Sequence, residues 1–340
     1  MPALSVLDQS PIPSGATAAA ALANTVDLAR RCERLGYTRY WVAEHHNTTG
    51  LAGPAPEVMV ARLGAATSAM RVGSGGVMLP HYSPLHVAEQ FRVLASLFPG
   101  RVDLGLGRAP GGDQLSAAAL RAGVEAPFPH AVQDLIGWLE DRLDPRHPFA
   151  AVRATPEPPE PPEVWMLGSS DYGAAVASVL GTSFSFAHFI NPPIGPEVVA
   201  AYRERFRPSP RLAAPRVSVG VGVVCAETTE EALRLSASAR LWRRRLRRGD
   251  PGPVPSVEEA LAELGADGER MPHDPESRMV VGAPDEVRER LIEVTARYGA
   301  DELVVLTICH DHAARVRSYE LLADAFGLAA RDEAAAVAAR

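Results

Sequence analysis

The sequence contains no lysine, and all 34 of its basic residues are arginine. Without lysine the chain can form no Schiff base with a substrate and cannot build a phosphate-binding loop that ends in Gly-Lys-Ser/Thr. Net positive charge is lacking as well, because the formal charge at pH 7 is -7. A general nucleic-acid-binding surface is therefore not expected.

Cysteine and long apolar runs are equally scarce. The three cysteines, Cys32, Cys225 and Cys309, lie far apart and fit neither a disulfide framework nor a zinc-binding spacing. The first residues carry no basic segment followed by an apolar one, and no apolar run approaches the length of a membrane span. We predict a cytoplasmic protein that binds neither membranes nor nucleic acid.

Short apolar segments alternate with segments of helical periodicity along the whole chain. Eight short segments read as strands, each followed by a predicted helix, at residues 4–7, 40–43, 72–79, 102–106, 164–167, 183–187, 217–225 and 303–307. Eight such units favour a (β/α)8 TIM barrel, an α/β fold, over a doubly wound open sheet. We predict one barrel domain over residues 1–340 with two insertions.

The two insertions differ in composition. Residues 109–163 are irregular, with one helix expected around 130–143 and a proline-rich end at 155–163. We interpret them as an excursion between the fourth and fifth strands, not as a linker between domains. A second, loop-rich insertion covers residues 248–281 and precedes the last strand.

Histidines gather where the predicted strands end. The active site of a TIM barrel lies at the carboxyl ends of its strands. Six of the ten histidines fall at such ends, namely His45, His46, His81, His188, His310 and His312. The plain alternative is that loops are generally polar, but that explains less well why histidines in particular collect at one rim.

A metal centre is the first use to consider for these histidines. On an extended strand only one of the adjacent residues His45 and His46 can point into the barrel mouth, because successive side chains alternate. The first strand lacks a His-x-His pair, and no carboxylate is placed to bridge two metals. We predict no bound metal and keep a metal hydrolase as an alternative to test.

Two glycine-rich segments follow strands. The segment 105-GLGRAPGGD-113 suggests a close backbone approach to a flat or anionic ligand, with Arg108 supplying charge. An ordinary loop with a surface arginine is the alternative. The glycines of 73-GSGGVMLP-80 indicate either backbone that packs against something flat or tight packing of the barrel itself.

The segment 164-VWMLGSSDYG-173 is typical of a phosphate site. A strand ends in Gly168-Ser169-Ser170 where a helix begins, and free backbone N–H groups at a helix start favour an anion. The two serine hydroxyls would add donors. The alternative is simple capping of the helix by Ser170 or Asp171.

An arginine run, 243-RRRLRR-248, lies on a predicted helix. Such runs usually form a solvated helix face. Attraction of an anionic partner is the other interpretation.

Together these segments resemble the bacterial luciferase-like flavin-dependent monooxygenases over nearly the whole chain. The resemblance is carried by YWVAEHH (40–46), GSGGVMLPHYSPLHVAEQF (73–91), PGRVDLGLGRAPGGD (99–113), VWMLGSSDYGA (164–174) and ADELVVLTICHDHAARVRSYELLA (300–323). The last segment, with the AEHH and GLGRAPG forms, is similar to the subgroup called luciferase family oxidoreductase group 1.

The resemblance implies a TIM barrel with insertions that uses reduced FMN and O2. In this family the oxygen passes by way of a flavin hydroperoxide to a small organic substrate, here expected in secondary metabolism. A separate flavin reductase supplies the reduced flavin, and a homodimer is expected. Two alternatives stay open: a deazaflavin-dependent oxidoreductase, and a flavin-binding homologue without catalysis. The insertion 248–281 matches the position of a mobile lid.

The resemblance also assigns residues. It makes His45 the catalytic base and places Glu44 beside the flavin ring as a second catalytic residue, with His46 in support. A non-proline cis peptide bond is expected near Gly75 and Gly76. The complete expected cofactor set is Glu44, Gly75, Gly76, Arg108, Gly168, Ser169, Ser170 and Tyr172. His81 and His310 are expected to touch substrate.

Overall fold

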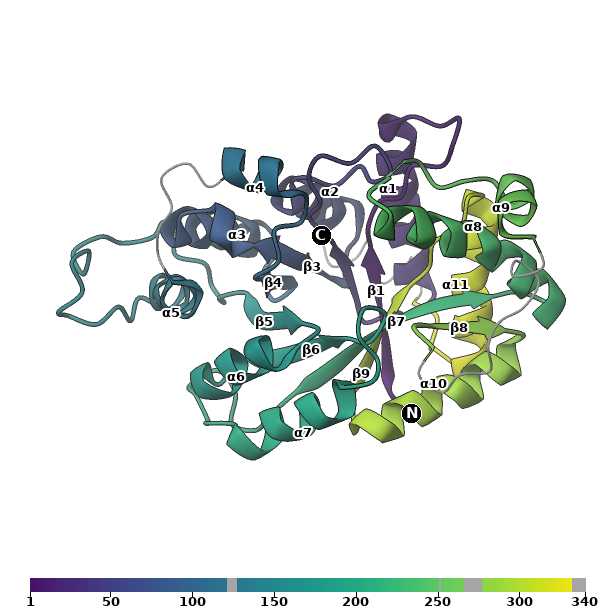
Figure 1. The fold of residues 1–340 in the computed structure, drawn as a ribbon. Helices are drawn as coiled ribbons and strands as arrows, with labels where there is room; N and C mark the ends of the chain where they lie inside the picture. Colours follow the sequence, from purple (N-terminus) through teal and green to yellow (C-terminus); the bar gives the residue numbers. More distant parts are fainter. Residues whose placement is uncertain (121–126, 251, 266–276, 332–340) are drawn as a thin grey trace.

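The computed structural model describes residues 1–120, 127–250, 252–265 and 277–331 (Figure 1). Its centre is a sheet of nine parallel strands: β1 (Ala3–Asp8), β2 (Arg39–Val42), β3 (Arg71–Met78), β4 (Val102–Gly107), β5 (Glu163–Gly168), β6 (Ser183–Ala187), β7 (Val217–Cys225), β8 (Met279–Gly282) and β9 (Glu302–Leu306). The ring closes in the order β1 to β7, then β9, then β1 again. The predicted eight-stranded TIM barrel is therefore confirmed.

The ninth strand, β8, lies outside the closed ring and was not predicted. β7 is nine residues long and buried throughout. Its first half pairs with β6, its middle with β9, and its end, Gly222 to Cys225, with β8. β8 has only four residues, which is too short for a periodic pattern to reveal.

Helices surround the strands (Figure 1). They are α1 (Ala18–Arg34), α2 (Pro56–Ala66), α3 (Pro84–Leu97), α4 (Gln114–Leu120), α5 (Phe128–Leu139), α6 (Asp171–Leu180), α7 (Gly195–Arg205), α8 (Thr229–Arg247), α9 (Val257–Leu264), α10 (Pro284–Tyr298) and α11 (His312–Phe326), with a 3-10 turn η1 (Leu79–His81). Side chains cap several starts: Thr228 accepts from the third residue of α8, and Asp311 does the same for α11.

Both insertions contain more regular structure than the sequence predicts. The excursion between β4 and β5 carries α4 as well as the expected α5. The insertion 248–281 contains α9 and most of β8. Residues 251 and 266–276, on which the lid expectation also depends, lie outside the described residues.

The amino end of the barrel interior is filled by buried charges. Arg39 is fully buried, and its guanidinium donates to Asp103 at 2.6 Å and to Glu302 at 2.7 Å. The Trp41 indole also donates to Asp103, at 2.9 Å. Above this network Leu7, Trp41, Trp165 and Val304 form an apolar layer. The interior is thus a packed core, as in other TIM barrels, and leaves the carboxyl rim for chemistry.

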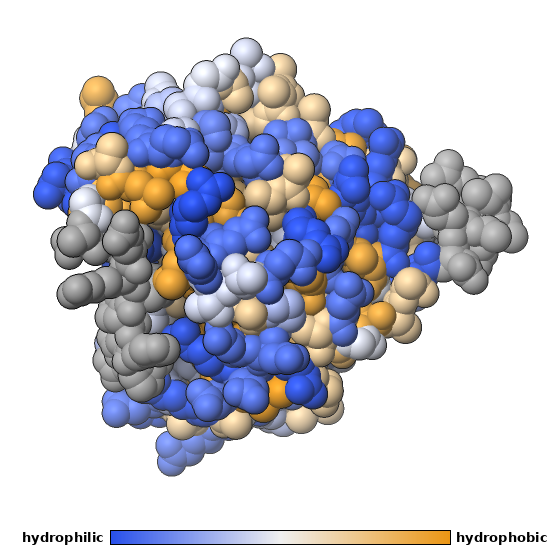
Figure 2. All heavy atoms as spheres, turned by 90° about the vertical axis from the view of Figure 1, so that its right-hand side faces the viewer, coloured by the Kyte–Doolittle hydropathy of each residue, from blue (hydrophilic) through white to orange (hydrophobic). Residues whose placement is uncertain are grey.

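The outer surface gives no sign of a membrane span. Hydrophilic side chains cover most of the face that carries α8 to α11, with apolar side chains scattered between them (Figure 2). Within the described ranges, no helix is both long enough and apolar enough to cross a bilayer.

Candidate active site

Glu44, His45 and His46 follow β2 in irregular backbone. The backbone N–H groups of His45 and His46 donate to the carbonyls of Gly53 and Gly111, so the chain has already left the ladder. Both imidazoles line one cavity at the barrel mouth. The expectation that only one of them faces the mouth is therefore wrong, because side-chain alternation ends with the strand at Val42.

The Glu44 carboxylate is buried and links the loop after β2 to the end of β3 and the turn that follows it. It accepts hydrogen bonds from the Tyr82 hydroxyl at 2.7 Å, from His46 Nε2 at 2.7 Å and from the Met78 backbone N–H at 2.8 Å. Burial, together with the bond to Glu44, raises the pKa of the Tyr82 hydroxyl well above its usual value, so Tyr82 remains a donor. Glu44 is buried and is not among the residues that line the cavity.

The His45 ring, unlike that of His46, forms no hydrogen bond with a described side chain. Its Nδ1 is buried without a hydrogen bond to any described residue. Burial, with a smaller effect from His46, lowers the pKa of His45 to about 4. At pH 7 the imidazole is therefore neutral and can accept a proton.

The mouth cavity has a volume of about 580 Å³. Its lining comes from the loops after β2, β4 and β6, from the end of α8 and from the residue before β8. The lining residues include Gln9, His45, His46, Leu51, Asp113, Phe189, Trp242, Arg243, Arg247, Arg278 and Leu306. The sequence analysis missed the contribution of α8, although the arginine run marked the helix that provides it.

The glycines after β4 approach the protein's own histidine. A Cβ on Gly111 would lie 3.2 Å from the Glu44 carbonyl oxygen and 3.5 Å from the His46 ring. A Cβ on Gly112 would lie 2.8 Å from the His46 carbonyl oxygen. Both glycines also line the mouth cavity, so the interpretation of 105–113 as backbone that approaches a ligand stays a prediction.

The glycines of β3 agree with both interpretations of 73–80, tight packing of the barrel and backbone that can pack against a flat ligand. A Cβ on Gly73 would lie 2.3 Å from the Asp103 carbonyl oxygen of β4, so part of the pattern is tight strand packing. The peptide bond between Gly75 and Gly76 is cis, as expected. Gly75 lies over Leu7 and Trp41, at the top of the packed interior.

A second group of predicted residues gathers at the start of α6. The Arg108 guanidinium packs over the Tyr172 ring at 4.0 Å from its centroid. Ser170 occupies the cap position of α6, yet its side chain makes no capping hydrogen bond. The Ser169 carbonyl accepts from Asn191 Nδ2 at 3.2 Å, and Asn191 follows Phe189 and Ile190 of the mouth cavity. The β6 loop therefore joins the two groups.

The other rim histidines form hydrogen bonds or ion pairs within the protein. His81 is buried and donates through Nε2 to the Pro110 carbonyl at 2.7 Å. His310 contacts Ser14 at 3.2 Å. His312 pairs with Asp27, and His188 with the Tyr298 hydroxyl. Neither His81 nor His310, the two residues expected at substrate, is among the residues that line the mouth cavity.

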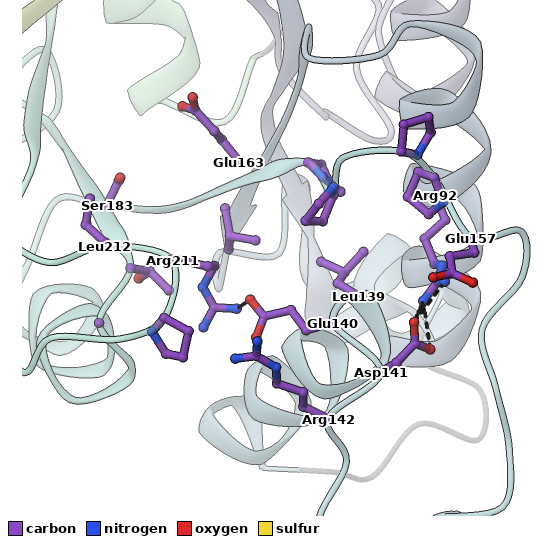
Figure 3. A pocket seen from close by; sticks show the side chains of 18 of the residues that line it. Arg92, Leu139, Glu140, Asp141, Arg142, Glu157, Glu163, Ser183, Arg211 and Leu212 are labelled. Atoms are coloured by element: carbon purple, nitrogen blue, oxygen red, sulfur yellow. Dashed lines mark hydrogen bonds and ion pairs between the residues drawn. The ribbon is translucent and has the colours of Figure 1, made fainter.

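A cavity of about 550 Å³ lies at the opposite end, where β5 and β6 begin (Figure 3). Its charges are largely paired with one another: Arg92 with Asp141, Arg211 with Glu140, and Arg216 with Glu163. Such pairs hold the excursion against the barrel, and barrel active sites lie at the other rim. The mouth cavity is therefore the candidate active site.

Several known proteins with a similar sequence or structure are monooxygenases. The family model described as luciferase-like monooxygenase matches residues 3–302. The N-acetyl-S-alkylcysteine monooxygenase of Bacillus subtilis (strain 168) is 40% identical over 95% of this chain and 97% of its own. The crystal structure of apo-MsnO8 superposes with a TM-score of 0.89 at 42% identity, covering 97% of this chain and 99% of that one. The FMN complex of the 3,6-diketocamphane monooxygenase oxygenating constituent from Pseudomonas putida shares the fold, with a TM-score of 0.69 at 18% identity over 95% and 97% of the two chains.

Proposed function

The chain belongs to the family of luciferase-like monooxygenases, and from that premise we propose that it uses reduced FMN and O2 to transfer one oxygen atom to a small organic substrate. The observation that carries the proposal is the neutral His45 in the mouth cavity, joined through the β6 loop to the Arg108 and Ser169 group. A separate reductase would supply the reduced flavin, since the sequence has no nicotinamide-binding fingerprint.

The phosphate of FMN fits the start of α6. Ser169 and Ser170 bring two hydroxyls to a helix of ten residues, whose first N–H groups favour an anion. Arg108 is exposed, and its described contact is the Tyr172 ring, so its N–H groups can still bind a phosphate. Gly168 leaves the approach to these groups open, with no atom closer than 3.7 Å to the position of a Cβ.

The flavin ring fits the floor that Gly75 and Gly76 provide. These two residues present backbone without side chains above Leu7 and Trp41, and Gly76 also touches Leu167. Glu44 lies behind the end of the same strand, through its bond to Met78. When bound, reduced FMN supplies the electrons that activate O2; the protein's part is to hold the ring, exclude water and provide a proton acceptor.

His45 would be that proton acceptor. It is neutral at physiological pH because of its lowered pKa, and its ring borders a cavity large enough for a substrate. His46, fixed by Glu44, keeps the loop in position. Glu44 is then a positioning residue, since its oxygens are already bound to Tyr82, His46 and Met78.

Flavin titration tests the proposal. Oxidised and reduced FMN, riboflavin and a deazaflavin are each titrated under anaerobic conditions into the native protein, Arg108→Met and the surface control Arg146→Met. We expect reduced FMN to bind best and to lose affinity only in Arg108→Met, with riboflavin unaffected by that change. Absence of binding by any flavin in either redox state would overturn the proposal.

Turnover with a flavin reductase then separates the remaining alternatives. N-acetyl-S-alkylcysteines, named for the Bacillus relative, are the first compounds to assay. Hydride transfer with the deazaflavin alone would indicate the oxidoreductase instead. Equal rates of reduced-flavin oxidation in the native protein and His45→Ala would indicate a binding protein without catalysis.

A further inference from the structure

The arginine run of α8 divides between two surfaces. Arg244 and Arg245 turn to α9, where they pair with Glu263 at 3.1 Å and Glu259 at 2.9 Å. Arg243 and Arg247, one helical turn apart, instead line the mouth cavity. The interpretation of the whole run as a solvated face is therefore wrong for Arg243, which is partly buried, whereas Arg247 is exposed.

Arg243 is seated against the barrel wall. A Cβ on Gly222 of β7 would lie 3.2 Å from Arg243 Nη2 and 3.0 Å from the Arg278 carbonyl oxygen, so the glycine makes room for the guanidinium. Arg278, the residue before β8, lines the same cavity. Burial, with Arg278 and Arg247 close by, lowers the pKa of Arg243 to about 10, which still leaves it charged at pH 7.

No described residue neutralises this cluster. Arg243, Arg247 and Arg278 form no hydrogen bond or ion pair within the described part of the chain. Asp113 is the acidic residue in the cavity lining, and it already accepts from Asn47 Nδ2 at 2.6 Å and from the Ser116 N–H at 2.7 Å. Arg243 is partly buried, whereas Arg247 and Arg278 are exposed. A partly buried cation that has no counter-ion among the described residues favours the binding of an anion.

The rest of the cavity is shaped for an apolar body. Its lining also includes the apolar side chains of Leu51, Phe189, Trp242, Leu246 and Leu306. The two polar ends lie apart, because β1 and β9 separate β2 from β7 in the barrel. The cavity thus offers cationic, apolar and neutral histidine side chains to one ligand.

We propose that the mouth cavity binds an organic acid whose carboxylate or sulfonate is held by Arg243, Arg247 and Arg278, while its apolar body extends towards His45. Arginine suits this task because its planar guanidinium binds such groups with two parallel hydrogen bonds. Binding of the acid in the cavity is independent of the proposed function. Only the further step, that the bound acid is the molecule oxygenated, rests on that function.

The test measures binding to the full chain without flavin. Octane-1-sulfonate, octanoate and 1-octanol, which share one alkyl chain, are titrated calorimetrically into the native protein, Arg243→Met and Arg317→Met. Arg317 is exposed, pairs with Glu227 and lies away from the cavity. We expect both anions to bind at least about tenfold more tightly than octanol, and Arg243→Met to remove that preference while Arg317→Met keeps it.

The thermal midpoint of Arg243→Met shows whether any loss of binding comes from loss of folding. Removing an unpaired cation should leave the thermal midpoint of Arg243→Met unchanged or raise it, so lost binding would not mean lost folding. Equal affinity for octanol and octanoate, or an unchanged preference in Arg243→Met, would overturn the site. Weakened FMN binding in Arg243→Met, with riboflavin unaffected, would overturn it too, because the arginines would then serve the flavin phosphate. Native protein that binds octanoate but no flavin would sink the proposed function alone.

Discussion

His46 Nε2 lies 2.7 Å from Glu44 Oε1, and the same oxygen accepts the Tyr82 hydroxyl at 2.7 Å. Since a carboxylate only accepts, this pair determines that His46 carries its proton on Nε2. The rim therefore contains two neighbouring histidines with different duties. One is fixed as a donor to a buried carboxylate, and the other, His45, is neutral and borders the cavity.

Glu44→Gln should loosen this corner. A glutamine keeps the size of the side chain but turns one acceptor into a donor, which then faces the donors Tyr82, His46 or Met78. We expect a loss of about 1–3 kcal/mol in the free energy of unfolding, measured by urea denaturation. The exposed control Glu157→Gln should change that free energy by less than about 0.5 kcal/mol. Equal stability of the two variants would contradict the three-bond geometry.

The protonation of His45 should be visible by NMR. Its pKa of about 4 means that the ring stays neutral from pH 8 down to pH 5 and gains its proton only below that. If His45 is the base, kcat/KM should be flat over the same range and fall only towards pH 4. A titration near the ordinary value of about 6.5 would contradict the burial of the ring.

His45 should also shape the acid stability of the fold. Its pKa is lower in the folded chain than in the unfolded chain, so between pH 6.5 and about 4 the unfolded chain binds the extra proton. The contribution of His45 to folding stability is therefore lost as the pH falls through that window. His45→Gln should flatten the pH dependence of the urea midpoint there, and an unchanged slope would count against the assignment.

Gly111→Ala should disturb the loop that packs on His46. Gly111 has φ of +65°, and a Cβ there would lie 3.2 Å from both the Glu44 carbonyl oxygen and Met78. Gly15, with φ of +81° and no atom within 4 Å of the Cβ position, is the matched control for backbone strain alone. We expect Gly15→Ala to cost about 1 kcal/mol and Gly111→Ala about 1–3 kcal/mol more. Similar costs in urea denaturation would mean that the loop can move aside.

Arg39→Met should be severe. It would leave the buried carboxylates of Asp103 and Glu302 without their guanidinium partner, at a cost of about 3–5 kcal/mol in unfolding free energy. Arg31→Met removes a half-exposed ion pair with Asp27 and should cost less than about 0.5 kcal/mol. A mild effect of Arg39→Met would show that the network is dispensable.

The sequence was a good guide wherever a pattern is local. Eight strands and their helices follow from apolar periodicity, and the cis peptide bond between Gly75 and Gly76 follows from the family resemblance. It was a poor guide to which way side chains turn outside regular structure. His45 and His46 share a cavity because the backbone leaves the sheet at Val42, and no periodicity reports that.

The direction of the α8 arginines depends on distant partners. Arg244 and Arg245 turn away from the mouth because Glu259 and Glu263 of α9 lie opposite them, and α9 was not predicted. What remains for the cavity is Arg243 and Arg247. Which arginines face the cavity depends on how α8 packs against α9. The sequence of the run alone does not distinguish one arginine from another.

The end of β7, from Gly222 to Cys225, pairs with β8 and so separates substitutions near β8 from substitutions in the barrel core. β8, which Arg278 precedes, is held to this part of β7 by main-chain hydrogen bonds, and almost any side chain is compatible with such pairing. The attachment uses β7 alone among the strands of the closed ring, and the buried ions of Arg39, Asp103 and Glu302 take no part in it. If the proposed acid site is correct, Arg278 and the α8 arginines can be exchanged to suit another acid without a change in the Gly75–Gly76 floor, and a redesign of specificity should begin there.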